Sequence, residues 1–270
     1  MYWRAAERWR QGIGRLAAGA VDCGSVVRIA IVADIHANLD ALTAVLRHAE
    51  AGGGLDALWA IGDLVGYGAE PSEVLATLRM HRLAAVAGNH DLAACGAIGV
   101  EEFNAAAGAA ALWTRSRLDL SGRAFLAALP RTRVEGGFTF AHGSVRDPVW
   151  EYLLSAEQAL VQFELQTTPY SIVGHSHLPF ACEEDAGGVP RWRRADDGMR
   201  LEPAETRLIV NPGSVGQPRD GDPRASYVLY DDRAATLTWR RVEYDIAAAQ
   251  RKIIAAGLPA WLAARLASGT

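Results

Sequence analysis

Gly174-His175-Ser176-His177 places two histidines one residue apart, directly after the short apolar run Ser171-Ile172-Val173. A strand that ends there would release the chain into a loop at the edge of a sheet. Four other stretches share this arrangement of an apolar run followed by metal-binding residue types: Asp34-Ile35-His36, Gly62-Asp63, Gly88-Asn89-His90-Asp91 and Ala141-His142-Gly143. We expect the fold to bring these five loops together around a pair of metal ions.

The length and composition favour one large domain. The chain has 270 residues, of which 50% are hydrophobic, enough to bury a full α/β core. The net charge of −4 gives no overall electrostatic reason to expect nucleic acid or a membrane as partner. No apolar run reaches the length of a membrane span. The cysteines, Cys23, Cys95 and Cys182, are scattered and form no CxxC pattern, which favours a reducing, cytoplasmic compartment.

The first 24 residues differ from the rest of the chain. They combine four arginines with scattered tryptophan and aliphatic residues, and they contain no continuous apolar segment of the kind that secretory signals have. We interpret residues 1–24 as a loosely attached extension, which a start codon placed too early would also explain. A helix that binds a membrane surface or a partner is the alternative. Residues 25–270 are expected to form a single domain.

The first half of the chain repeats a strand, a loop and a helix. Apolar strands are predicted at 27–33, 58–61 and 83–87, and helices at 39–49, after the cap Asn38, and at 72–82, after Pro71. This order predicts a doubly wound α/β arrangement, whose sites form beyond the carboxyl ends of the strands.

The second half changes to shorter elements. Helices are predicted at 102–117, at 121–129 with Ser121 as cap, at 155–166 with Ser155 as cap, and over 245–266, broken near 257–259. Strands are predicted at 138–141, 171–173, 179–182, 189–194, 208–210, 226–230 and 235–242, of which the last two are expected to form a hairpin. The later short strands predict a second, more antiparallel sheet packed on the first, with helices outside. The alanine-rich helices of about 101–130 are expected to form a partial lid.

The polar residues in the loops suit a transition-metal site. Asp34 and His36 can turn toward one ion, and carboxylate with imidazole favours Mn, Fe, Zn or Ni over Ca or Mg. Asp63 has two carboxylate oxygens and can bridge two ions, whereas Asn89 offers a weaker amide oxygen. Taken singly, each motif also fits a turn, a cap or a structural histidine. Five of the seven histidines lie in these loops, so the joint pattern is far more specific.

The combined motifs carry a family resemblance. Asp34-x-His36, Gly62-Asp63, Gly88-Asn89-His90, His142 and Gly174-His175-x-His177 resemble, in order, the signature of the calcineurin-like metallophosphoesterase superfamily. Asn211-Pro212-Gly213-Ser214 resembles its compact bacterial and archaeal phosphodiesterase branch, which also includes the vacuolar sorting subunit of the retromer complex. The Asp-Arg-Gly of the Ser/Thr phosphatases is absent after the second motif, and Gly66 stands where purple acid phosphatases have a tyrosine ligand.

The resemblance implies a four-layer α/β/β/α sandwich of two mixed β-sheets flanked by helices. It implies two divalent transition-metal ions, for which manganese is the preferred assignment and iron, zinc or nickel are the alternatives. One ion would be held by Asp34, His36, Asp63 and His177, and the other by Asp63, Asn89, His142 and His175. A metal-bridging hydroxide would attack phosphorus in line, and His90 would contact the substrate and stabilise or protonate the leaving oxygen.

The substrate is expected to be a small phosphorylated molecule. Tyr67 could stack on a base and Arg219 could bind a second phosphate, although both could equally be structural. The stretch from Gly62 to Gly68, with Phe103-Asn104, resembles family members linked with dinucleotides, which favours hydrolysis of phosphodiester or phosphoanhydride bonds in small nucleotides. The alternatives are a non-catalytic binding or scaffold protein on this fold, and a nuclease, which the absence of an extended basic stretch disfavours. The oligomeric state stays open.

Overall fold

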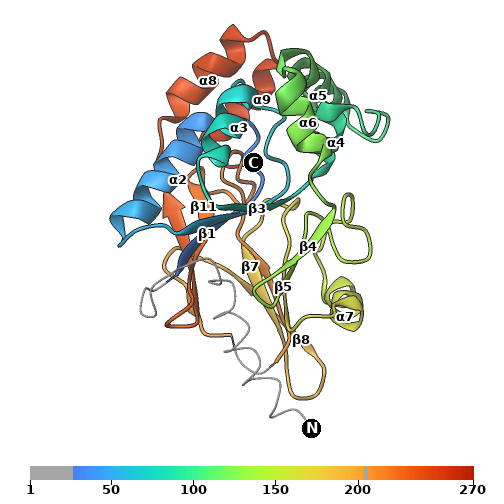
Figure 1. Cartoon of the computed structure of the whole chain (residues 1–270), viewed down its shortest axis with the longest axis vertical. Coiled ribbons are helices and arrows are strands. Elements are labelled where there is room, and N and C mark those ends of the chain that lie inside the picture. Colours follow the sequence, from blue (N-terminus) through green and yellow to red (C-terminus); the bar gives the residue numbers. More distant parts are fainter. Residues whose placement is uncertain (1–26, 204–205) are drawn as a thin grey trace.

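The computed structural model describes residues 27–203 and 206–270, so the predicted extension at 1–24 lies outside the described residues. The described residues form two six-stranded sheets that pack face to face, with helices on their outer faces (Figure 1). The fold is therefore the four-layer α/β/β/α sandwich that the resemblance implied. Among the described helices, none combines the length and the apolar character needed to cross a lipid bilayer.

The first sheet has the strand order β3-β2-β1-β11-β12-β9. Its members are β1 (Arg28–Val32), β2 (Ala57–Ile61), β3 (Leu83–Val86), β9 (Arg200–Leu201), β11 (Ala225–Asp231) and β12 (Thr236–Val242). The first three are parallel, and β11, β12 and β9 add antiparallel pairs. The hairpin predicted over 226–242 was assigned to the second sheet, and this was wrong. It pairs with the free edge of β1, where it satisfies backbone groups that an edge strand leaves exposed.

The second sheet has the order β4-β5-β6-β10-β7-β8. Its members are β4 (Thr132–Glu135), β5 (Phe138–Ala141), β6 (Tyr170–Ile172), β7 (Phe180–Glu184), β8 (Pro190–Arg194) and β10 (Leu208–Asn211). Strands β5, β6 and β10 are parallel, and the outer pairs are antiparallel. Both sheets are therefore mixed, and the parallel strands of each send their carboxyl ends into loops.

The helices surround the sheets on two sides. They are α2 (Leu39–Ala51), α3 (Pro71–Arg79), α4 (Asn89–Cys95), α5 (Ala105–Arg117), α6 (Leu120–Ala127), α7 (Ala156–Leu165), α8 (Ile246–Ala255), α9 (Ala260–Ala264) and the 3-10 turn η1 (Arg265–Ala267). Helices α2 and α3 pack on the first sheet, and α7 packs on the second (Figure 1). Asp119 caps α6 through the Gly122 amide, so the predicted cap Ser121 was wrong; it lies inside the helix.

An aromatic core fills the space between the sheets. Trp59 of β2 lies with its ring centroid 4.9 Å from that of Phe140 and 5.4 Å from that of Phe138, both on β5. These side chains are almost fully buried, together with Tyr230 and Trp239 from the antiparallel half of the first sheet. The large rings hold the two sheets in one relative position, and this position sets where the loops at their ends meet.

Candidate metal centre

The loops that leave the two sheets are joined by backbone hydrogen bonds. The Asp34 amide donates to the Gly62 carbonyl at 3.1 Å, and the His36 amide donates to the Asp63 carbonyl at 2.9 Å. Across the sheets, the His175 amide donates to the Asp34 carboxylate, with Oδ2 at 3.1 Å. Loops separated by more than a hundred residues in sequence therefore form one connected unit at the meeting point of the sheets.

The backbone of this unit is strained. Asp34, His36, Asp63, His175 and His177 all have φ between 49° and 64°, in the left-handed region that residues with a Cβ rarely adopt. In the described part of the chain, eight non-glycine residues have positive φ, and all except Ala235 lie in these loops. Such conformations cost roughly 1–3 kcal/mol each and persist where the surrounding structure imposes them, typically at functional sites.

One cluster of donors joins Asp34, His36 and His177. The Nε2 atoms of His36 and His177 are 3.1 Å apart, and Asp34 Oδ1 lies 3.3 Å from His177 Nε2 and 3.9 Å from His36 Nε2. All three side chains are buried. Three ligand-type atoms converging on one buried point are the arrangement that a cation site requires.

A second cluster joins Asp63, His142 and His175. His142 Nε2 lies 3.4 Å from Asp63 Oδ2 and 3.1 Å from His175 Nδ1. Asp63 Oδ2 is also 3.7 Å from His36 Nε2, so this oxygen lies between the two clusters. Asp63 Oδ1 instead accepts a hydrogen bond from the His90 amide at 2.9 Å. The sequence suggested that each oxygen could bind one ion, whereas the structure presents Oδ2 alone to both clusters.

Backbone carbonyls orient three of the imidazole rings. Nδ1 contacts the Val65 carbonyl at 3.3 Å in His36, the Ile61 carbonyl at 2.9 Å in His142 and the Gln217 carbonyl at 2.5 Å in His177. A ring that donates from Nδ1 presents the lone pair of Nε2 to the centre, which is the form that binds a metal ion. His175 is reversed: its Nδ1 faces the centre.

The protonation states follow from burial and from Asp63. Burial lowers the pKa of His36 and of His175 well below the usual value, so both rings are neutral at pH 7. Burial would also lower the pKa of His142, but the nearby Asp63 carboxylate outweighs it and raises this pKa to about 9. Burial would raise the pKa of Asp63, and His142 and His90 instead hold it well below its usual range.

The donor set fits divalent metal ions. Carboxylate oxygens and imidazole nitrogens together suit transition metals of intermediate softness. Asn89, the first residue of α4, is buried, and its Oδ1 has no hydrogen-bond partner among the described residues. A buried acceptor without a partner costs free energy that a bound cation would recover. All seven residues predicted as metal ligands lie at this centre, where groups of their side-chain atoms are close enough together to hold metal ions.

His90 lies beside the centre, on the first turn of α4. Its ring centroid is 5.0 Å from that of His36 and 4.3 Å from that of Tyr67. Burial lowers the pKa of His90 to about 4. Asp91 accepts hydrogen bonds from the Val65 and Gly88 amides, at 3.1 and 3.0 Å, and fastens the loop after Asp63 to α4.

A cavity of about 70 Å³ opens onto the donors. The two predicted substrate residues border it: the Arg219 guanidinium carbon is 5.9 Å from the Tyr67 ring centroid. Trp150 and Tyr152 also line it, and neither was predicted. The Tyr152 ring stacks on His175 with centroids 3.9 Å apart. The available signal was the aromatic pair Trp150-x-Tyr152 in the loop that follows His142. Residues 102–104, where the predicted lid begins, form another part of the wall.

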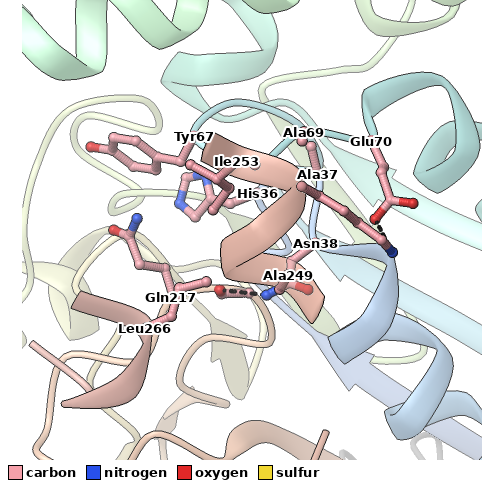
Figure 2. A pocket seen from close by; sticks show the side chains of 13 residues that line it. His36, Ala37, Asn38, Tyr67, Ala69, Glu70, Gln217, Ala249, Ile253 and Leu266 are labelled. Carbon is pink, nitrogen blue, oxygen red and sulfur yellow. Dashed lines mark hydrogen bonds and ion pairs between the residues drawn. The ribbon is translucent and has the colours of Figure 1, made fainter. Parts of the chain in front are cut away.

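The C-terminal helices pack against the loop that carries Tyr67. Tyr67 packs in one apolar cluster with Ile253 of α8 and Leu266 of η1, and His36 borders the same narrow space (Figure 2). The Lys252 ammonium donates to Glu70 at 2.9 Å and to Asp40 at 2.8 Å, which ties α8 to the end of the Tyr67 loop and to the start of α2. The left-handed Tyr67 is therefore held by packing on both sides.

Comparison with known proteins supports one family. The sequence profile of the calcineurin-like phosphoesterase superfamily domain matches residues 27–234. An uncharacterized protein of Methanocaldococcus jannaschii is 36% identical over 246 residues, covering 89% of this chain and 98% of that protein.

Two solved structures resemble the whole described fold. A metallophosphoesterase from Sphaerobacter thermophilus is 41% identical, covers 91% of this chain and 100% of its own, and superposes with a TM-score of 0.82. A hypothetical protein from Pyrococcus horikoshii, 21% identical, covers 90% of this chain and 99% of its own, and shares the fold with a TM-score of 0.75. The chain therefore belongs to the calcineurin-like phosphoesterase superfamily and is a metal-dependent phosphoesterase.

Proposed function

We propose that this enzyme hydrolyses phosphodiester or phosphoanhydride bonds of small nucleotides and uses two divalent metal ions. The position of Asp63 carries the proposal. Its Oδ2 lies 3.7 Å from His36 Nε2 in one donor cluster and 3.4 Å from His142 Nε2 in the other. A single carboxylate oxygen between two sets of imidazole nitrogens is the arrangement expected of a bridging ligand.

We assign the ligands to the two ions as the resemblance implies. Asp34, His36 and His177 would share one ion with Asp63, while Asn89, His142 and His175 would share the other with Asp63. Each ion then has about four protein ligands, all from buried side chains. Mixed imidazole nitrogen and carboxylate or amide oxygen donors fit manganese, iron, zinc and nickel, and of these we propose manganese.

The chain's own residues would orient the phosphoryl group. Two divalent ions held by these residues would supply an activated water nucleophile and would neutralise charge on the phosphoryl oxygens. His90 borders the same cavity as Asp63 and Asn89, so its ring can donate a hydrogen bond to the leaving oxygen. The Arg219 guanidinium lies beside Tyr67 on the same cavity and can pair with a further phosphate oxygen. Catalysis by positioning and electrostatics is typical of phosphoryl transfer.

Aromatic rings around the cavity support a nucleotide as substrate. Phe103 lies with its centroid 4.9 Å from that of His90 and 5.1 Å from that of Trp150. Tyr67 and Tyr152 line the cavity as well. Aromatic rings at the border of a phosphate-binding centre favour a flat base over an aliphatic alcohol in the part of the substrate that extends out of the cavity, because base–aromatic stacking contributes about 1–3 kcal/mol.

The test is hydrolysis with and without the bridging carboxylate. With Mn²⁺ present, initial rates are compared for bis-4-nitrophenyl phosphate, 4-nitrophenyl phosphate and diadenosine tetraphosphate. Asp63→Asn keeps an acceptor for the His90 amide but removes the charge. Unit charges about 4 Å apart interact by about 4 kcal/mol at an effective dielectric constant of 20, so activity should fall roughly 10³-fold. Asp56→Asn, at an exposed backbone-capping aspartate, is the matched control and should stay near wild type.

The outcomes separate the alternatives. Faster cleavage of the dinucleotide than of the artificial diester supports a small-nucleotide hydrolase, and preferential cleavage of oligonucleotides or plasmid DNA would indicate a nuclease instead. Absence of turnover with Mn²⁺, Fe²⁺, Zn²⁺ and Ni²⁺ would refute the catalytic reading and favour a binding or scaffold role. A helical lid over about 101–130 and a cytoplasmic location stay predictions.

A further inference from the structure

We propose that a second hollow beside the metal centre binds the nucleoside half of the substrate; this rests on the function proposed above. The hollow measures about 410 Å³ and is lined chiefly by Leu154, Leu178, Phe180, Trp192, Arg194 and Arg219. We call it the Trp192 hollow. Its lining residues Phe180 and Trp192 come from β7 and β8, the antiparallel pair at one edge of the second sheet (Figure 1).

The sizes of the two spaces require a second binding region. The cavity over the metal ligands holds about 70 Å³, which suits a phosphoryl group. Pockets that bind whole organic ligands measure about 300–1,000 Å³. A nucleotide whose phosphate reaches the metal ligands must therefore place most of its organic part outside that cavity. The Trp192 hollow, at about 410 Å³, falls within the required range.

The hollow and the cavity meet at one residue. Arg219 lines both of them. Leu178 directly follows the ligand His177, and Leu154 is two residues beyond Tyr152, which stacks on His175. The Nε atom of Arg219 is buried and has no hydrogen-bond partner among the described residues. A phosphate that connects the metal centre with the hollow would pass this guanidinium and could accept from it.

The lining of the hollow suits a flat ring with a polar edge. The Trp192 indole stacks on Phe180 with centroids 3.9 Å apart and an interplanar angle of 27°. Leu154 adds an apolar side chain that is 54% exposed to water and that a bound ring would bury. Arg194 at the rim donates to the Asp220 carbonyl at 2.8 Å and pairs with the Asp220 carboxylate at 3.3 Å, and Asp220 also lines the hollow. An aromatic platform with fixed guanidinium groups nearby recognises a nucleobase by stacking and by hydrogen bonds at its edge.

Binding of two products of different size tests the proposal. Isothermal titration of the Mn²⁺-loaded protein compares adenosine 5′-monophosphate with inorganic phosphate. Both can reach the metal centre, but only the nucleotide can also fill the hollow. We expect the nucleotide to bind at least tenfold more tightly. Trp192→Ala should weaken nucleotide binding roughly tenfold, as the loss of a base–aromatic stack does, and should leave phosphate binding unchanged.

Further variants distinguish a loss of the nucleotide site from a general loss of folded structure. Trp192→Phe should retain most of the nucleotide preference. Leu154→Trp, at an exposed position, should fill the hollow and weaken nucleotide binding alone. Trp261→Ala, at a half-exposed tryptophan on α9, is the matched control and should change neither affinity. Thermal unfolding of each variant verifies the fold.

The outcomes are distinct from those of the proposed function. Equal affinity for nucleotide and phosphate in the unaltered protein, or a nucleotide preference that survives both Trp192→Ala and Leu154→Trp, would overturn the assignment of the hollow. These binding results stand whether or not the dinucleotide is hydrolysed. Failure of hydrolysis with intact nucleotide preference would refute the catalytic proposal and retain the hollow as a nucleotide site.

Discussion

Gly88→Ala tests whether the close fit around Asp63 sets activity. Gly88 caps α4 with φ −96° and ψ 176°, which alanine adopts without strain. A Cβ there would lie 2.1 Å from Asp63 Oδ1 and 2.5 Å from the Asp63 amide nitrogen. Optimal contacts between heavy atoms are about 3.5–4.0 Å, so Asp63 and its backbone must move by about 1 Å.

The expected effect on activity exceeds the effect on stability. Overpacking of this kind costs about 1–3 kcal/mol in the free energy of unfolding. A displacement of about 1 Å in a catalytic group can lower the rate by about 10²-fold. The shift would also weaken the hydrogen bond from the His90 amide to Asp63 Oδ1. We therefore expect a folded protein with roughly 10²-fold lower kcat/KM for bis-4-nitrophenyl phosphate.

Gly108→Ala is the matched control. Gly108 lies inside α5, and a Cβ there would meet its nearest neighbour, Val100 Cβ, at 3.6 Å, an ordinary contact. Glycine in a helix interior costs about 0.5–1 kcal/mol relative to alanine, so this variant should be slightly more stable and fully active. Calorimetric unfolding, manganese content and steady-state kinetics are measured for both variants. Wild-type activity and metal content in Gly88→Ala would refute the reasoning.

The loop of the histidine pair, metal removal and pH give three further tests. Asn211→Ala removes donors to the Gly174 carbonyl and Ser176 Oγ, at 2.9 and 3.0 Å, and should lower metal affinity about 10–100-fold by titration calorimetry; an unchanged affinity would contradict this. Mn²⁺ at about 100 times its Kd should raise the free energy of unfolding by about 2.7 kcal/mol relative to the chelator-treated protein. This corresponds to an increase in Tm of about 5–10 °C. Equal Tm values with and without Mn²⁺ would exclude binding to the folded state. Because the pKa of His142 is raised to about 9 in the metal-free centre, this ring carries a proton at pH 7 that a metal ion must displace. Metal affinity should therefore rise about tenfold per pH unit between pH 7 and 9, with about one proton released in calorimetry across buffers, and a pH-independent affinity would disprove this protonation state.

Local signals in the sequence predicted the elements and the donors. The apolar runs before Asp34, Asp63 and His142 are strands, and Asn38 caps its helix as expected. These features depend on neighbouring residues, so a short window contains the information. The same window failed where local choices compete: Asp119 and Ser121 are both good caps for α6, and the structure uses Asp119. The seven residues of α4 are too few to show a helical period.

Only the tertiary structure decided how the donors and hollows lie relative to one another. His36 and His177 are separated by 141 positions, yet their Nε2 atoms are 3.1 Å apart because the aromatic core fixes one sheet on the other. The choice of Asp63 Oδ2 as the shared oxygen depends on a hydrogen bond from a helix that the sequence did not predict. The place of Arg219 between the cavity and the Trp192 hollow is likewise a relation between segments that are distant in sequence. The pattern of apolar residues predicts which polar side chains follow the end of a strand. The packing of the two sheets determines which of these side chains come into contact.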